Sequence, residues 1–207
     1  MRARMAILLS GLTLELRDVL LKDKPVEMTS ISPKATVPVL AFPNGHVLEE
    51  SLDIMLWAVE QGGPDNSYPQ SPEIRTEIMD LIEENDGSFK RALDRYKYHV
   101  RFPENTREEY RCQAEVFLSK LEGRLNSHTF LISDNPNLAD IAIFPFIRQF
   151  ANSDRQWFDQ APYPALQKWL NNWTASASYL HIMKKRPIWE AGLSGPFFPT
   201  LENTDVL

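Results

Sequence analysis

The segment from Val37 to Ile54 restricts the possible folds more than any other part of the chain. It begins with a short apolar run, and Asn44-Gly45 follows. Asn-Gly is the strongest short hairpin signal, because both residues tolerate the positive φ of a type I′ turn. A second short strand is predicted from Val47 to Glu49, and apolar residues then recur at helical spacing. The pattern predicts an antiparallel hairpin that leads directly into a helix.

The start of that helix has the chemistry of a cap and of a ligand site. Ser51 is expected to cap the helix through its hydroxyl, and the acidic residues beside it suit the positive end of the helix dipole. A helix N-terminus with free N–H groups also accepts a ligand carboxylate. From these residues alone, a purely structural hairpin and helix and a ligand site both remain open.

The residues before the hairpin predict a helix and a strand. Arg2 to Ser10 carries apolar residues at helical spacing, and Gly11 is expected to end the helix. Leu14 to Val19 alternates apolar and charged residues, which is typical of a half-buried strand. Lys22 to Ser32 is polar and is expected to be irregular, with at most a short helix.

After a polar segment rich in glycine and proline near residues 62–72, the pattern is helical throughout. Asn137 and Asp140 resemble a capping box ahead of an apolar run. The tail after Gly192 is expected to wrap over the surface, and Trp169 and Trp173 are expected to form a core pair. The predicted helices are Glu73 to about Val100, Thr106 to about Asn126, one opened by Asn137 that ends near Phe150 with a kink at Pro145, and one beginning at Tyr163.

Charge and composition exclude several functional classes. The net charge of −6 argues against a nucleic-acid partner, which favours a basic face. Cys112 is the only cysteine, which fits a reducing, cytoplasmic location, and we interpret it as a structural or idle residue. No stretch is long and apolar enough to suggest a membrane span. No metal is predicted, because the histidines are far apart in sequence: His46, His99, His128 and His181.

Two motifs together identify a family resemblance. The run Lys34 to Leu40, followed by Glu49 to Ile54, resembles the second half of the thioredoxin-like domain of glutathione transferases. The resemblance implies that Val37 offers its backbone to the cysteinyl part of glutathione, and that the bond before Pro38 is cis. It also implies that Glu50 and Ser51 hold the γ-glutamyl group, with Lys34 among the glutathione-binding residues. The resemblance extends to Tyr163–Leu170 and so covers most of the chain.

The resemblance also implies that the fold is incomplete at its beginning. Residues 2–6 resemble the helix that follows a Cys-Pro or Ser-Pro active-site motif in this family. The family's first strand would lie between the Leu14–Val19 strand and the hairpin, so we expect Leu14–Val19 to lack an inner neighbour. The predicted fold is an α/β thioredoxin-like domain with its first strand missing (1–62), a linker (63–72) and an all-α domain (73–207). The cause is either a start site placed too far downstream or a true loss of the strand.

The function implied by the resemblance is glutathione-dependent transfer to, or thiol reduction of, a small electrophile, with glutathione as co-substrate. The basic and aromatic residues Arg95, Tyr96 and His99 are expected to face the second substrate, although a solvated helix end explains them as well. A homodimer is expected by analogy with the family, formed by the Ser51–Gln61 helix and the Glu73–Val100 helix packing on their counterparts. We assign no catalytic residue and expect some glutathione binding with little turnover. The alternative is a non-catalytic binding or interaction protein that keeps the fold and lacks the thiol-activating residue.

Overall fold

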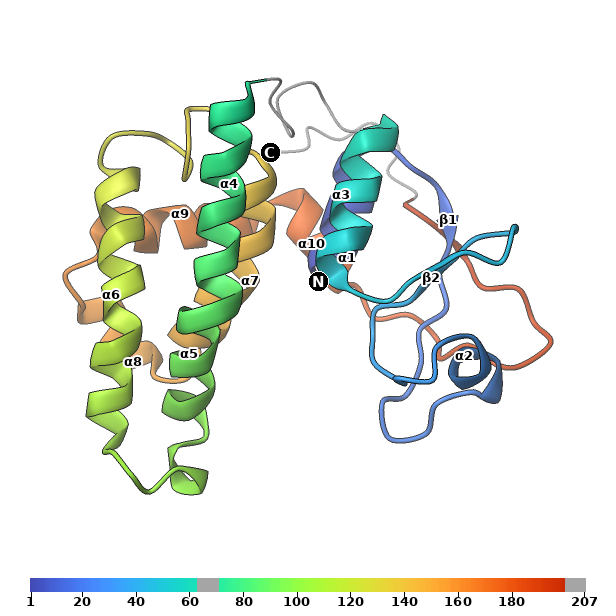
Figure 1. Ribbon diagram of the computed structural model, residues 1–207, viewed down its shortest axis with the longest axis horizontal. Coiled ribbons are helices and arrows are strands. Elements are labelled where there is room, and N and C mark those ends of the chain that lie inside the picture. The colour runs from blue at the N-terminus through green and yellow to red at the C-terminus, as the bar shows by residue number, and fades with distance from the viewer. Residues whose placement is uncertain (63–70, 200–207) are drawn as a thin grey trace. The chain divides into compact units, whose positions relative to one another are not determined.

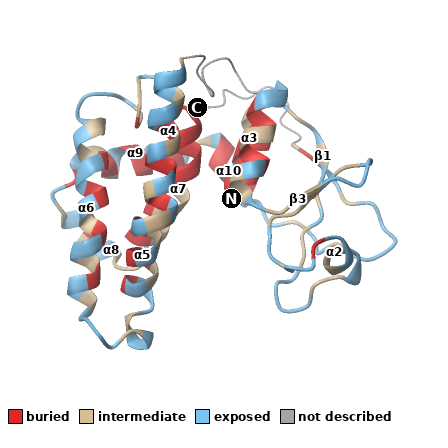
Figure 2. Ribbon diagram, in the orientation of Figure 1, coloured by how far each residue is buried: buried red, intermediate tan, exposed pale blue. Residues whose placement is uncertain are grey.

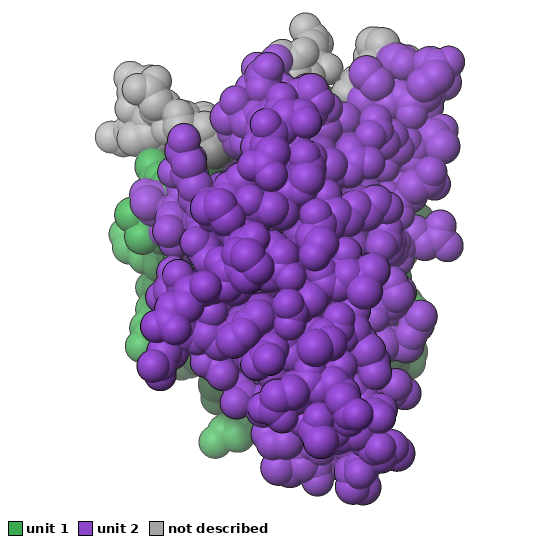
Figure 3. Space-filling model, turned by 90° about the vertical axis from the view of Figure 1, so that its left-hand side faces the viewer, with its two compact units in different colours: residues 1–64, 176–207 green, residues 65–175 purple. Residues whose placement is uncertain are grey.

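The computed structural model describes residues 1–62 and 71–199, and it divides into two compact units. Figure 3 colours unit 1, residues 1–64 with 176–207, in green and unit 2, residues 65–175, in purple. The sequence placed residues 176–207 in the helical domain, whereas the structure groups them with the beginning of the chain. The predicted linker lies largely outside the described residues, and its end, Ser71-Pro72, already belongs to the start of a helix.

The helices of unit 1 come from both ends of the chain. They are α1 (Arg2–Leu9), α2 (Val26–Ile31), α3 (Ser51–Gly62) and α10 (Ala177–Met183), drawn in Figure 1. Helix α1 packs against both α3 and α10. Gly11 follows α1 with φ +67°, which confirms that this glycine ends the helix. Gly62 meets the end of α1 so closely that a Cβ atom would lie 2.5 Å from the Ser10 carbonyl oxygen.

The predicted hairpin is present, but its turn differs from the expected one. Strand β2 (Leu40–Ala41) pairs antiparallel with β3 (Val47–Leu48). Of the loop residues only Gly45 has positive φ, at +86°, and its N–H donates to the Phe42 carbonyl at 3.0 Å. Because Pro43 sets a negative φ at the first corner, a three-residue loop ending in glycine forms in place of the predicted type I′ turn.

The predicted strand from Leu14 to Val19 is shorter than expected and has an unexpected partner. Strand β1 covers Leu14–Glu15 and pairs antiparallel with β4 (Phe197–Phe198), near the C-terminus. Phe198 is only 2% exposed, so the tail does not simply wrap over the surface. The backbone groups of β1, which we expected to lack the family's inner neighbour, are therefore paired with a segment from far along the chain.

Unit 2 is helical. The predicted helix from Glu73 to Val100 is divided by a π-helical turn (Asn85–Phe89) into α4 (Pro72–Glu84) and α5 (Lys90–Lys97), and a 3₁₀ turn (His99–Arg101) follows. The π turn coincides with Asn85, Asp86 and Gly87, which favour a regular α-helix less than most residues do. The remaining helices are α6 (Arg107–Leu125), α7 (Leu138–Ala151), α8 (Arg155–Gln160) and α9 (Pro164–Ala175).

Local caps start the two longest helices of unit 2 at the predicted residues. Thr106 and Glu109 form a capping box at α6, and Asn137 and Asp140 form one at α7. In each box the two residues satisfy backbone N–H groups that the helix itself leaves unpaired. These predictions are confirmed.

The core of unit 2 is built from large aromatic side chains, and Figure 2 shows buried positions along its helices. Phe89 lies 4.9 Å from Phe117 between ring centroids, and Phe144 stacks on Trp173 at 5.1 Å. Trp169 and Trp173 are both buried, which confirms the predicted core pair. Among the described helices, none is long and apolar enough to cross a membrane.

Candidate functional site

The junction between the hairpin and α3 holds most of the predicted glutathione-binding residues. The Glu50 carbonyl accepts the first intrahelical hydrogen bond, from the Ile54 N–H at 3.1 Å, so Glu50 occupies the cap position. Ser51 is the first residue of α3, and the prediction that it caps the helix is wrong by one position. The half-buried Ser51 side chain makes no hydrogen bond with any residue that the structure describes. Its hydroxyl is available to a ligand.

Acidic side chains and one lysine surround this helix start. The Lys34 ammonium lies 3.1 Å from the Glu50 carboxylate, and both side chains are more than half exposed. Glu50 raises the pKa of Lys34, and Glu49 and Asp53 add to the effect. The buried Ser32 hydroxyl donates to Glu49 at 2.6 Å, a contact that the sequence did not predict. Because exposed ion pairs contribute little to stability, the Lys34–Glu50 pair is easily exchanged for a ligand contact.

The segment before β2 has the backbone form that the resemblance implied. The Val37–Pro38 peptide bond is cis, which confirms the prediction. Val37 is 45% exposed. The chain reaches it through a turn in which Ala35 has φ +53° and donates its N–H to the Ser32 carbonyl at 2.9 Å.

The arrangement suits a small ligand that carries both an ammonium and a carboxylate group. The positive end of α3 and its first N–H groups attract a carboxylate, and the Ser51 hydroxyl adds a donor. The carboxylates of Glu50 and Asp53 are exposed and attract an ammonium group. An α-amino acid end, as in a γ-glutamyl group, has this combination of charges.

The residues predicted to face a second substrate lie in different surroundings. Tyr96 is buried in the core of unit 2, with its ring 5.1 Å from that of Phe150 and beneath the Arg107 guanidinium at 4.9 Å. Burial raises the pKa of Tyr96. Arg95 is exposed and lies over the Tyr110 ring, and His99 lies in the 3₁₀ turn. The predicted role of Tyr96 in a substrate cleft is not supported, because its side chain fills the core.

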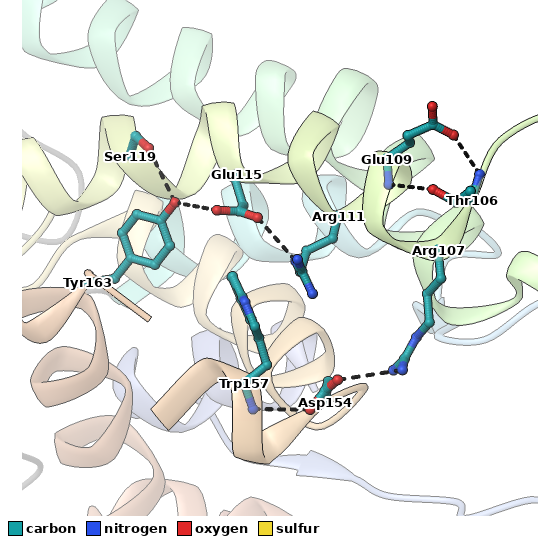
Figure 4. Close-up of polar contacts among 9 residues, drawn as sticks. All are labelled: Thr106, Arg107, Glu109, Arg111, Glu115, Ser119, Asp154, Trp157 and Tyr163. Atoms are coloured by element: carbon teal, nitrogen blue, oxygen red, sulfur yellow. Dashed lines mark hydrogen bonds and ion pairs between the residues drawn. The ribbon is translucent and has the colours of Figure 1, made fainter. Parts of the chain in front are cut away.

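A polar network in unit 2, which the sequence did not reveal, joins α6 to α8 and α9 (Figure 4). Arg111 donates from Nε to Glu115 at 3.2 Å, and the Tyr163 hydroxyl donates to the other Glu115 oxygen at 2.9 Å. The Arg111 guanidinium also lies 4.6 Å from the centre of the Trp157 ring. These contacts are satisfied within the unit, so we interpret the network as structural. Cys112 is exposed beside it.

Asp140 is the most deeply buried acid of the predicted motifs. It accepts hydrogen bonds from the Leu131 N–H at 3.0 Å, the Asn137 N–H at 3.1 Å and the Trp169 indole N–H at 2.9 Å. Burial raises its pKa to about 6, although these hydrogen bonds act in the opposite direction. Asp140 therefore anchors three segments of unit 2. Within residues 1–62 and 71–199, no group of three acidic, histidine or cysteine side chains is arranged to hold a metal.

Comparison with known proteins places these features in a family. The model for "Glutathione S-transferase, N-terminal domain" matches residues 1–61, and that for "Glutathione S-transferase, C-terminal domain" matches residues 105–172. Together they span more than half of the chain.

Solved structures agree with both matches. Glutathione S-transferase 1-6 from Anopheles dirus species B is 27% identical, with a TM-score of 0.68 over 84% of this chain and 83% of its own. A delta-class glutathione transferase from Nilaparvata lugens is 26% identical, with a TM-score of 0.69 over 86% and 84%. A glutathione S-transferase from Rhodospirillum rubrum F11, 17% identical, shares the fold with a TM-score of 0.71 over 94% and 90%.

Proposed function

The chain belongs to the glutathione transferase family, and we propose that it binds glutathione at the start of α3 and uses it on a small electrophile. The observation that carries the proposal is the exposed start of α3. Ser51 is the first residue of the helix, and its hydroxyl makes no hydrogen bond with the described residues. The exposed Glu50 carboxylate precedes it directly in the chain.

In the proposed complex, the γ-glutamyl carboxylate meets the helix N-terminus and Ser51, and the γ-glutamyl ammonium meets Glu50. Lys34 pairs with Glu50, and its positive charge partly offsets the negative charge of that carboxylate. The exposed Val37 offers its backbone N–H and carbonyl to the cysteinyl part of the peptide, as an extended ligand pairs with an exposed backbone.

The proposed chemistry is transfer of the glutathione sulfur to an electrophile or reduction of a mixed disulfide. Both reactions need a thiolate near neutral pH, which hydrogen-bond donors and positive potential around the sulfur provide. The resemblance implies a Cys-Pro or Ser-Pro motif ahead of α1, and we assign its catalytic role to no residue of this chain. Arg95 and His99 remain candidates for contact with the second substrate. The rival function is that of a non-catalytic binding or interaction protein that keeps the fold, with or without the glutathione site.

Calorimetric titration with glutathione tests the binding site. Ser51→Ala should weaken binding about fivefold to tenfold, because about 1 kcal/mol is lost with one hydrogen bond. Ser71→Ala is the matched control, since Ser71 caps α4 in unit 2, and it should leave the affinity unchanged. Cysteinyl-glycine, which lacks the γ-glutamyl group, should bind far more weakly. Equal affinities for Ser51→Ala and the unsubstituted chain would contradict the proposed site.

Conjugation and mixed-disulfide assays on the same preparation separate the two functions. Turnover supports the transferase, and binding without turnover in either assay supports the binding protein. Since both outcomes require glutathione binding, the titration is interpreted first.

We also propose a cytoplasmic homodimer. The family relationship supports the dimer, and the single cysteine fits a reducing compartment. The apolar residues Ile54, Met55 and Ile78, on the helices that we expected at the dimer interface, are buried within their own units. A dimer must therefore use other residues of α3 and α4. Light scattering at micromolar concentration tests the assembly, and the mass of a single chain would contradict it.

A further inference from the structure

Strand β1 presents an edge that needs a partner for its backbone groups. An unpaired strand edge exposes N–H and C=O groups, and a hydrophobic one favours pairing with another chain. In this structure β4 pairs with the edge of β1. The segment that ends in β4 runs from Lys184, at the end of α10, to Phe198, nearly the full length of the chain away from β1.

Hydrogen bonds extend beyond the two residues of the strand pair. The Leu16 N–H donates to the Pro196 carbonyl, and the Trp189 N–H donates to the Asp18 carbonyl, each at 2.8 Å. The Gly195 N–H donates to the Glu15 carboxylate, also at 2.8 Å. The Arg17 guanidinium lies 4.6 Å from the centre of the Trp189 ring. The segment therefore contacts residues 14–18 along their whole length.

The backbones approach most closely at Gly195. A Cβ atom at this position would lie 2.3 Å from the Leu16 carbonyl oxygen, well inside the contact distance of real atoms. The obstacle is backbone and cannot rotate away. Glycine is therefore required at residue 195, because the backbone of Leu16 lies so close. At Gly123, by contrast, an added Cβ atom would meet nothing within 4 Å beyond its own helix backbone.

The two residues of β4 point to opposite sides. Phe198 is 2% exposed, and it lies beside the His181 ring at 5.5 Å and beneath the Arg186 guanidinium at 5.1 Å. Phe197 is 69% exposed. Since burial of a large aromatic side chain is strongly favourable, Phe198 anchors the segment and Phe197 does not.

This segment lies outside both matched family regions, which cover residues 1–61 and 105–172. We propose that the edge of β1 is a strand-acceptor surface whose occupant is the chain's own segment 184–198, anchored by Phe198. This segment, which we call the strap, is then an integral part of unit 1, and its pairing protects the β1 edge from pairing with a second copy.

A register-specific cross-link tests the occupant. Glu15 and Phe197 face each other at a position between the hydrogen-bonded pairs, where opposite Cβ atoms are close enough for a disulfide. In a Cys112→Ser background, Glu15→Cys with Phe197→Cys should form an intrachain disulfide under mild oxidation. Arg17→Cys with Phe197→Cys is the register control. Residue 17 is two positions away from the residue opposite Phe197, so this pair should not form a disulfide. A disulfide-linked dimer, or equal linkage in both pairs, would overturn the proposal.

Hydrogen exchange in the full chain tests the anchor. Phe198→Ala and Gly195→Ala should each speed exchange of the peptide containing Leu16 by about tenfold or more, with helices α6 and α7 unchanged. Phe197→Ala, the neighbouring control, should leave the exchange unaltered. If the peptide containing Leu16 exchanges at the same rate in Phe198→Ala and in Phe197→Ala, Phe198 does not anchor the segment. If either change unfolds the whole chain, the cross-link at Glu15 and Phe197 still decides whether the strap closes on its own chain.

Discussion

The starts of α3 and α7 place acidic side chains at the same end of a helix, in opposite surroundings. Asp140 of α7 is fully buried and accepts three hydrogen bonds from its own unit. Glu50 at α3 is exposed and pairs only loosely with Lys34. The favourable potential of a helix N-terminus is thus used for internal structure in one case and left available to solvent in the other.

The difference teaches which helix start holds the fold together and which one leaves its charge exposed at the surface. A buried acid with satisfied partners gives rigidity, but its removal leaves several donors without acceptors. An exposed acid costs little to change, and it keeps its charge free for a ligand.

The largest expected effect is on Asp140. Asp140→Ala should lower the free energy of unfolding by about 3 kcal/mol, because the Leu131, Asn137 and Trp169 donors lose their acceptor in a buried site. Denaturation in urea measures it. Glu50→Ala is the matched control and should change stability by about 0.5 kcal/mol or less. Equal losses for the two variants would remove the contrast between the helix starts.

The pH dependence of stability sharpens the contrast. Burial raises the pKa of Asp140 from 3.8 in the unfolded chain to about 6, so the folded state binds the extra proton between these values. The contribution of Asp140 to stability is therefore fully present below about pH 4 and is lost as the pH rises through 6. As the pH rises from about 4 to above 6, the free energy of unfolding of the unsubstituted chain should fall by about 3 kcal/mol relative to that of Asp140→Asn. A difference that is independent of pH would show that Asp140 does not titrate there.

The smallest effect on stability is expected at Lys34. Lys34→Ala removes one exposed ion pair with Glu50 and should change the free energy of unfolding by about 0.5 kcal/mol or less. Its effect should appear in glutathione titration, where the affinity changes while the urea midpoint does not. Lys120→Ala breaks the pair with Glu84 in unit 2 and serves as the control, with both quantities unchanged. A shift of the urea midpoint without a change in affinity would assign Lys34 to the fold.

Local features were predictable because their causes lie within a few residues. The capping boxes at Thr106 and Asn137, the end of α1 at Gly11 and the hairpin around Gly45 all depend on neighbours in the chain. The turn type was missed although Pro43 is local, since the Asn-Gly signal outweighed it. The cis bond at Pro38 was predictable only through the family resemblance.

The amino-acid sequence by itself determined the starts of α6 and α7, the end of α1 and the order of the two kinds of structure, and it is the source of the proposed glutathione-site residues. Only the tertiary structure decided that Tyr96 fills a core, that Asp140 meets Trp169, and that β4 pairs with β1. The physical reason is the separation along the chain between the residues that interact. Caps and turns are set by contacts over a few residues, whereas burial and strand partners depend on segments that folding brings together from far along the chain.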